Sequence, residues 1–267
     1  MNQSMAFIHP EAKIAPNVSI GPFSSIAANV VIGEGTWIGP NVHILDGVRI
    51  GNNCKIFPGA VLGGVPQDLK FKGEDTTAEI GDNTTIRECV TINRGTASKG
   101  KTVVGSNCLL MAYVHVAHDC ILGNNIILGN ATQLAGEVEI DDFAILSGLV
   151  AVHQFVKIGG HTMISGGSLV RKDVPPYIKA AHEPLAYVGI NSIGLRRRGF
   201  TPEAVSQIHD SYRILFTKKL STSSAINQIR ENIPHSDQKE YILDFLSDSH
   251  RGIIKGYYGN SDPSDEF

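Results

Sequence analysis

The chain has 267 residues, of which 42% are hydrophobic, so it is long enough to bury a sizeable core. Its net charge of −3 and pI near 6.4 argue against a general nucleic-acid binder or a protein that adheres to anionic membranes. No run of about 18 apolar residues predicts a transmembrane helix, and the N-terminus lacks the basic flank and apolar stretch of a signal peptide. We therefore expect a cytoplasmic protein.

An aliphatic residue recurs every six positions through most of the chain. From Ile8 to Val170, 25 of the 28 positions in this phase hold Ile, Leu or Val. A helix repeats at about 3.6 residues and a strand at two, whereas a period of six is typical of a β-helix built from hexapeptide repeats. Three hexads close one triangular coil of about 18 residues. The run therefore predicts a parallel β-prism of about nine coils over residues 1–176.

The three exceptions to this phase are Asp68, Glu74 and Ser98. They fall in two polar stretches, residues 65–78 and 96–101, and the phase resumes after each. We expect both stretches to be loops that project from corners of the prism. Loops on a rigid scaffold are where binding residues tend to lie.

The hexads end near Val170, and the prolines of Val174-Pro175-Pro176-Tyr177 cannot continue a regular ladder. Residues 177–199 are expected to form an irregular connector. A small α-helical domain is predicted over residues 200–258, and the polar tail 259–267 is expected to be disordered.

The first helix of this domain is predicted to begin with Thr201 as N-cap and Pro202 in the first turn. A second is predicted to start at Ser221 and end at Pro234, and a third to run through residues 241–246. A short last helix is predicted around Ile253 and Ile254.

Two histidines, His115 and His118, stand three residues apart, and Asp119 follows directly. A carboxylate that accepts from one ring nitrogen leaves the other nitrogen free to act as a base near neutral pH. Gly136 lies 18 residues after His118 and therefore directly above it on the next coil. Its N–H group could stabilise an oxyanion beside the base, as acyl transfer requires. The alternative interpretation is a solvated surface pair.

A zinc site formed by His115, His118 and His153 was weighed as well, but no closed ligand set is visible. We expect no metal and no cofactor. The four cysteines have neither metal-site nor disulfide spacing and are expected to be buried free thiols in a reducing compartment, three of them at inward hexad positions: Cys54, Cys108 and Cys120, with Cys89 one residue off.

Several segments together resemble the UDP-N-acetylglucosamine acyltransferases of lipid A biosynthesis, over nearly the whole chain. The His115–Asp119 region and the junction Gly194-Leu195-Arg196-Arg197-Arg198-Gly199-Phe200 are the most specific of them. The others are Gln67-Asp68-Leu69-Lys70, Thr91-Ile92-Asn93-Arg94-Gly95-Thr96, Ala151-Val152-His153-Gln154-Phe155 and Asp173-Val174-Pro175-Pro176-Tyr177.

The resemblance implies a mainly β protein, with a left-handed parallel β-helix, and a homotrimer with active sites in clefts between subunits. It implies transfer of a 3-hydroxyacyl chain from acyl carrier protein to the 3-position of UDP-N-acetylglucosamine. By the same resemblance His118 is the general base, Asp119 orients it, Gly136 holds the oxyanion and Gly166 helps to set acyl-chain length. The implied substrate-binding residues are Gln67, Asp68, Lys70, Asn93, His115, Glu137, His153, Gln154, Asn191, Arg197 and Arg198.

Three residues depart from the family pattern. Asn93 and Glu137 stand where histidines are expected, and Ile193 replaces an acidic residue. The acceptor group therefore stays open between a 3-hydroxyl and a 3-amino group, as does an N-acyltransferase acting later in the pathway. A non-catalytic structural trimer is a further alternative. For the acidic carrier protein, a basic docking patch is predicted from the residues Lys157, Arg171, Lys172, Lys179, Lys218 and Lys219.

Overall fold

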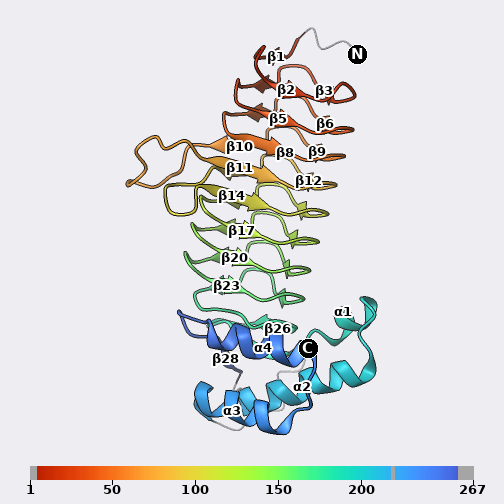
Figure 1. Ribbon diagram of the computed structural model, residues 1–267, viewed down its shortest axis with the longest axis vertical. Coiled ribbons are helices and arrows are strands. Elements are labelled where there is room, and N and C mark those ends of the chain that lie inside the picture. Colours follow the sequence, from red (N-terminus) through yellow and green to blue (C-terminus); the bar gives the residue numbers. More distant parts are fainter. Residues whose placement is uncertain (1–4, 218–219, 258–267) are drawn as a thin grey trace.

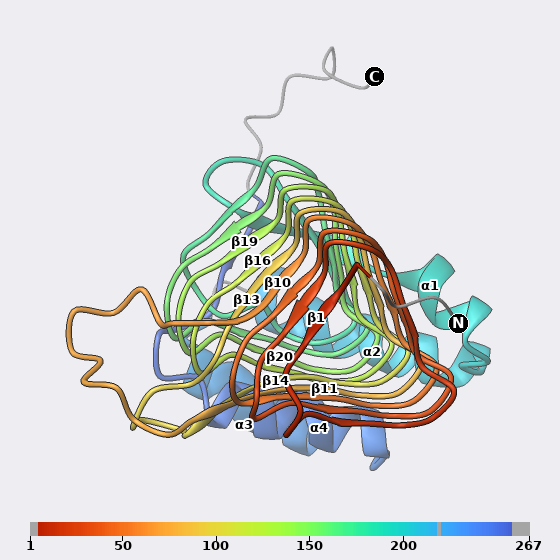
Figure 2. The ribbon, with the colours of Figure 1, turned by 90° about the horizontal axis from the view of Figure 1, so that it is seen from above.

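The computed structural model describes residues 5–217 and 220–257, which form a triangular prism with helices packed at its C-terminal end (Figure 1). Each hexad gives one short strand and one corner, and the strands of successive coils pair in parallel. Seen along the prism, the chain passes from coil to coil in the left-handed sense (Figure 2). The left-handed parallel β-helix is confirmed.

The three faces of the prism are three sheets. Sheet A has nine strands: β1 (Phe7–Ile8), β4 (Ser25–Ile26), β7 (His43–Ile44), β10 (Val61–Gly64), β13 (Thr91–Asn93), β16 (His115–Val116), β19 (Gln133–Leu134), β22 (Ala151–Val152) and β25 (Leu169–Val170). Sheet B has eight: β2 (Lys13–Ile14), β5 (Val31–Ile32), β8 (Val48–Ile50), β11 (Thr77–Ile80), β14 (Lys101–Val104), β17 (Ile121–Leu122), β20 (Glu139–Ile140) and β23 (Lys157–Ile158).

Sheet C has eleven strands, because the chain returns to it after the last coil. Its members are β3 (Ser19–Ile20), β6 (Trp37–Ile38), β9 (Lys55–Ile56), β12 (Thr85–Ile86), β15 (Leu109–Leu110), β18 (Ile127–Leu128), β21 (Ile145–Leu146), β24 (Met163–Ile164), β26 (Ile178–Ala181), β27 (Ala186–Ile190) and β28 (Lys255–Gly256).

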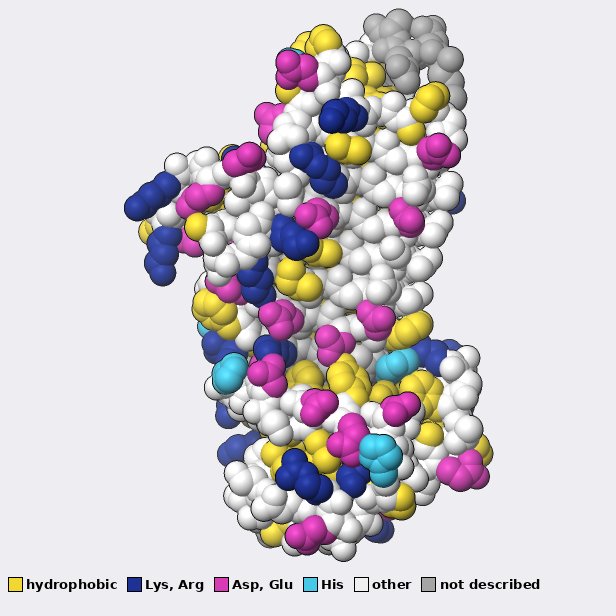
Figure 3. All heavy atoms as spheres, viewed as in Figure 1, with side chains coloured by type: hydrophobic (Ala, Val, Ile, Leu, Met, Phe, Trp, Pro, Cys, Tyr) yellow, Lys and Arg dark blue, Asp and Glu magenta, His cyan; other side chains and the backbone are white. Residues whose placement is uncertain are grey.

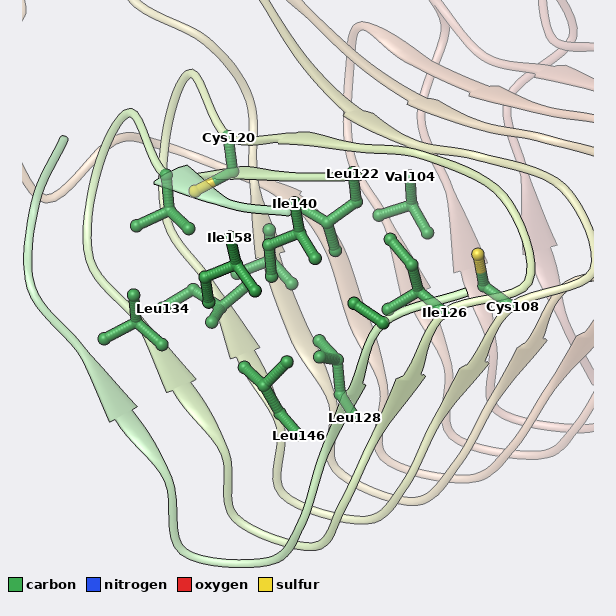
Figure 4. Packing of buried hydrophobic residues seen from close by; sticks show 14 of the residues in the cluster. Val104, Cys108, Cys120, Leu122, Ile126, Leu128, Leu134, Ile140, Leu146 and Ile158 are labelled. Atoms are coloured by element: carbon green, nitrogen blue, oxygen red, sulfur yellow. The ribbon is translucent and has the colours of Figure 1, made fainter. Parts of the chain in front are cut away.

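The aliphatic hexad residues point inward and stack in columns. Leu122, Ile140 and Ile158 of sheet B follow one another along the interior, as do Leu128 and Leu146 of sheet C (Figure 4). These side chains are at most 1% exposed. Since each coil buries its inner face only against its neighbours, the core is one continuous aliphatic column.

Two insertions interrupt the stack without disturbing its phase. Paired residues of neighbouring coils are normally 18 apart, as in His115 with Gln133. Leu62 instead pairs with Ile92, a separation of 92 − 62 = 30, and Ile92 pairs with Val116, a separation of 116 − 92 = 24. The excesses of 12 and 6 residues are whole hexads, so every aliphatic residue beyond the loops still points inward.

The C-terminal region contains four described helices: α1 (Ser192–Arg197), α2 (Pro202–Thr217), α3 (Thr222–Asn232) and α4 (Asp237–Ser247). The predicted N-caps are confirmed, since Thr201 Oγ1 accepts from the Ala204 N–H at 3.2 Å and Ser221 Oγ from the Ser224 N–H at 3.2 Å. The helices bury an apolar face that includes Tyr212, whose hydroxyl donates to the Pro176 carbonyl at 2.6 Å. None of the helices within residues 5–217 and 220–257 is long and apolar enough to cross a membrane.

Three local expectations were wrong. The connector 177–199 is not irregular, because β26 and β27 form an antiparallel pair that extends sheet C and α1 follows. Residues around Ile253 form no helix; this residue bridges to Asp173, and β28 then pairs with β27. Cys89 is exposed, whereas Cys54, Cys108 and Cys120 are buried as expected. The predicted disordered tail 259–267 lies outside the described residues.

Candidate active site

The corner between sheets A and B, which we call the A–B edge, carries both insertions. Residues 65–76 leave it after β10 and residues 94–100 after β13, and the longer loop projects far from the prism at the left of Figure 2. His118, Gly136 and Gln154 occupy the same position of this edge on three successive coils, because β16, β19 and β22 pair in register. The 18-residue spacing therefore predicted this column correctly.

His118 and Asp119 form a hydrogen-bonded pair at this edge, with 2.8 Å between His118 Nδ1 and Asp119 Oδ2. Both side chains were expected to point into solvent. Instead Asp119 is fully buried and His118 is 8% exposed, because the loop 94–100 folds over the carboxylate. The pair is thus held in a dry environment, where hydrogen bonds to a charge are stronger than in water.

Gly136 lies against the imidazole. A Cβ atom built on it would stand 2.5 Å from His118 Cε1 and 2.6 Å from Nε2, so no larger residue fits while the ring keeps its place. Among the described residues, the Gly136 N–H donates to no acceptor and His118 Nε2 has no hydrogen-bond partner. A free acceptor and a free donor therefore stand side by side at the surface of the A–B edge.

The Asp119 carboxylate is surrounded by donors from the loop. Thr96 donates both its N–H, at 2.9 Å, and its hydroxyl, at 2.6 Å, and the Lys99 N–H donates at 3.1 Å. Burial acts to raise the pKa of Asp119, but the hydrogen bonds from Thr96, His118 and Lys99 outweigh it and hold the pKa below its usual value. Asp119 is therefore an ionised acceptor at neutral pH.

His115 lies on the outer face of sheet A, three residues before His118. Its Nδ1 is 2.7 Å from the Thr91 hydroxyl on the preceding coil. Burial, together with the nearby His118, lowers the pKa of His115 below that of a free histidine. His115 is therefore neutral at physiological pH and can offer a ring nitrogen to a ligand.

Other predicted binding residues gather at the same edge. Gln67, Asp68 and Lys70 are in the longer loop, where the Lys70 N–H donates to Asp68 Oδ1 at 2.9 Å. Asn93 ends β13 and donates to the Val65 carbonyl at 3.0 Å, while its buried Oδ1 has no partner among the described residues. His153 and Glu137 belong to the coils above, and Glu137 borders a cavity of about 310 Å³ that Lys99, Phe155 and Arg251 also line.

The remaining predicted residues lie at other edges of the prism. Asn191 donates to the His161 carbonyl at 2.9 Å and Arg198 to the Phe143 carbonyl at 3.2 Å, which places both at the corner between sheets B and C. Arg197 adjoins Arg198 at the end of α1, to the right in Figure 2, away from the projecting loop. One copy of the chain therefore does not bring these residues to His118.

Gly166 lies at the third corner, between sheets C and A, against the Gly148 carbonyl on the preceding coil. It was predicted to line one groove with His118. The separation of 48 residues is two coils and two further hexads, so the two residues stand at different edges of one prism.

Sequence reasoning missed several supporting residues. Thr96 and Lys99 lie in a loop outside the hexad register, so spacing could not place them beside Asp119. The ring of His161 stacks between Phe143 and Tyr177, with centroids 4.9 and 5.5 Å away, and Phe143 in turn lies 5.2 Å from the Arg198 guanidinium. These aromatic side chains hold Arg198 in place.

The predicted basic patch is not a single surface. Lys157 is in sheet B, where it pairs with Glu139 at 3.7 Å, Arg171 pairs with Glu183, and Lys179 is in sheet C. Lys218 and Lys219 lie outside the described residues. On the face shown in Figure 3, basic side chains alternate with acidic ones along the prism. No group of three or more His, Cys, Asp or Glu side chains within the described ranges is arranged to hold a metal ion.

Comparison with known proteins matches both parts of the chain. The bacterial transferase hexapeptide family matches residues 29–64 and 101–136, and the second domain of UDP N-acetylglucosamine O-acyltransferase matches residues 173–254. The acyl-[acyl-carrier-protein]–UDP-N-acetylglucosamine O-acyltransferase of Burkholderia orbicola is 45% identical over 201 residues, which are 73% of this chain and 77% of that protein.

Solved structures agree over still more of the chain. A UDP-N-acetylglucosamine acyltransferase from Bacteroides fragilis is 58% identical and superimposes with a TM-score of 0.94, covering 96% of this chain and 100% of that one. The enzyme of Francisella novicida is 44% identical with a TM-score of 0.92, over 98% of this chain and 94% of that one. Fold, hexads and C-terminal domain agree throughout, and the chain belongs to the UDP-N-acetylglucosamine O-acyltransferase family of acyltransferases.

Proposed function

We propose that the protein transfers a 3-hydroxyacyl chain from acyl carrier protein to the 3-position of UDP-N-acetylglucosamine, the first step of lipid A biosynthesis, in the cytoplasm. The observation that carries the proposal is the His118–Asp119 pair beneath Gly136, with His118 Nε2 and the Gly136 N–H both unpaired within the described part of the chain. The named relatives act on the same two substrates.

The geometry fits a general-base mechanism. Asp119 accepts from Nδ1 of His118, so Nε2 carries the lone pair that removes the proton from the sugar hydroxyl. The sugar oxygen then attacks the thioester carbonyl, and the Gly136 N–H stabilises the negative charge on the carbonyl oxygen. As the carbon–sulfur bond breaks, the imidazolium returns its proton to the leaving thiolate, and the base is regenerated.

The nucleotide end of the substrate requires positive charge, which the A–B edge supplies sparsely. Arg197 and Arg198 provide planar guanidinium groups suited to a diphosphate, and Lys70 provides a further cation. Because the two arginines lie at the B–C edge, the proposal needs two copies of the chain, one contributing His118 and the next contributing Arg198.

A cyclic trimer satisfies this requirement, since each A–B edge then faces a neighbour in the same way. The third edge, between sheets C and A, carries exposed apolar side chains on separate coils. Phe23, Tyr113 and Leu149 are 62%, 65% and 69% exposed. A row of this kind is typical of a surface that another protein covers. The division into a prism over 1–176 and a helical domain over 200–258 leaves the base on the prism and the arginines at the junction.

A 3-amino sugar is the second candidate acceptor. Glu137, in place of a histidine, would favour an amine, and the buried Oδ1 of Asn93 offers an acceptor without a partner in the described chain. The two acceptors differ in product, since one gives an ester and the other an amide.

The experiment is product analysis by mass spectrometry. The purified protein is incubated with a ladder of 3-hydroxyacyl carrier-protein thioesters and either UDP-N-acetylglucosamine or its 3-amino analogue. We expect a product of acceptor plus acyl mass from the natural sugar, cleaved by mild base as an ester would be. Turnover of the amino analogue alone would replace the acceptor, and turnover of neither would contradict the function.

A further inference from the structure

The loop 94–100 is fastened at both ends to the prism around the buried carboxylate. Thr76 Oγ1 donates to the Gly95 carbonyl at 2.6 Å at one end, and Lys99 Nζ forms an ion pair of 2.7 Å with Glu139 at the other. Between them Thr96 is 8% exposed and contacts Asp119 through both its N–H and its hydroxyl. The loop that left the hexad register thus ends as the wall of the catalytic pair.

The direction of each hydrogen in this cluster can be worked out. The Ser98 N–H donates to Thr96 Oγ1 at 3.2 Å, so the hydroxyl proton of Thr96 is directed at Asp119 Oδ2. The N–H groups of Thr96 and Lys99 both donate to Oδ1. Since the carboxylate accepts from these three donors and has no proton of its own, His118 Nδ1 must be the fourth donor, and Nε2 is left as the acceptor.

From this arrangement we propose that Thr96 is a positioning residue of the acyl transfer. Its hydroxyl shares Asp119 Oδ2 with His118, which fixes the carboxylate rotamer, the tautomer of the imidazole and the share of negative charge that the imidazole feels. This inference rests on the proposed role of His118 as base.

Four other titratable groups surround the pair. His115 approaches from β16, Glu137 from the corner of the next coil and Cys120 from the residue after Asp119. The fourth is Lys99, whose ammonium group is paired with Glu139. None of these four side chains donates a hydrogen bond to Asp119, so the Thr96 hydroxyl is the side-chain donor, besides His118, that the described structure supplies.

The test compares Thr96→Val with Thr96→Ser and with Thr102→Val in the full-length protein. Thr102 is a matched control, because it is also a buried threonine next to Asp119, but its Oγ1 accepts from the Asp119 backbone N–H at 2.8 Å and does not reach the carboxylate. Two readouts are taken: kcat/KM for acyl transfer against pH, and ¹⁵N NMR of the histidine rings against pH, with the His118 signal assigned by its loss in His118→Gln.

Removing the hydroxyl in Thr96→Val leaves more negative charge on Oδ2 for the imidazolium, so protonated His118 is favoured. We expect the acidic limb of the pH profile and the NMR midpoint of the His118 ring to rise by about half a pH unit, and kcat to fall about tenfold with little change in KM. Thr96→Ser should restore both midpoints. Thr102→Val should lower the melting temperature and leave the midpoints where they are.

Equal midpoints in wild type, Thr96→Val and Thr102→Val would overturn the proposal. If Thr96→Val does not fold, the wild-type spectrum still decides, because a neutral His118 protonated on Nε2 contradicts the hydrogen-bond directions. If the wild type shows no acyl transfer, the proposed function fails, while the NMR midpoints still test the link between Thr96 and His118.

Discussion

Two edges of the same prism use the same hexad position in opposite ways. At the B–C edge the residue two after the inward aliphatic is often Asn or Asp, and it accepts from the backbone of the coil before. The N–H of Glu34 donates to Asn52 at 2.8 Å, that of Asn52 to Asp82 at 2.6 Å and that of Asn124 to Asp142 at 2.7 Å. The ladder satisfies itself, and this part of the edge serves stability.

At the A–B edge the equivalent positions hold His118, Gly136 and Gln154, and no such ladder joins them among the described residues. Instead an acceptor on His118 and a donor on Gly136 stay unpaired at one spot. Buried or half-buried polar groups are normally satisfied within the protein, so unused capacity of this kind indicates a place where a ligand supplies the partner. The contrast between the two edges separates the scaffold from the site.

The largest effect should come from removing the base. In His118→Ala, acyl transfer should fall by about 10²–10⁴, because no other group in the described part of the A–B edge can take the proton. The melting temperature should change little, since Asp119 keeps three donors from Thr96 and Lys99. Steady-state kinetics and circular dichroism measure the two; activity within tenfold of wild type would sink the assignment of His118.

Filling the space above the imidazole should be nearly as severe. In Gly136→Ala the new methyl would lie about 2.5 Å from the ring, so the ring must rotate away from the acceptor, and kcat should fall by about 10². The matched control is Gly148→Ala at the C–A edge, where the nearest atom to a new methyl is a carbonyl oxygen at 3.2 Å. Equal losses in both variants would mean that Gly136 is an ordinary corner glycine.

The third edge offers a test of acyl-chain length. If Gly166 of a neighbouring copy lines the acyl groove, Gly166→Met should deny burial to several methylenes at about 0.8 kcal/mol each. The ratio of ten-carbon to fourteen-carbon turnover should then rise by about two orders of magnitude. An unchanged ratio in competition assays would place the end of the groove elsewhere.

The smallest effect belongs to the structural ladder. Asn52→Ala removes the acceptor for the Glu34 N–H at an exposed corner, which should cost about 0.5–1 kcal/mol of stability. Acyl transfer at a temperature well below unfolding should match that of wild type. A large loss of activity without loss of stability would break the distinction between the two edges.

Much of this arrangement follows from counting residues. The six-residue period located the core from Ile8 to Val170, and an interval of 18 residues placed Gly136 over His118. Counting fails where residues leave the period, so the wrap of Thr96 and Lys99 around Asp119 had no signal in the sequence. It was misapplied for Gly166, whose 48-residue separation from His118 already implies another edge. The pairing of β26 with β27 and the strand at Lys255 depend on contacts between distant segments, which local propensity does not encode.

The central claim is that the A–B edge of one chain works with the B–C edge of the next. It is tested by co-expressing His118→Ala and Arg198→Ala chains with different tags and purifying the mixed assemblies. Each variant alone should be nearly inactive. Every mixed cyclic trimer contains one interface with both residues intact, so it should recover about one third of wild-type activity. Mixed assemblies as inactive as their parents, with the same molecular mass as wild type, would contradict a site shared between chains.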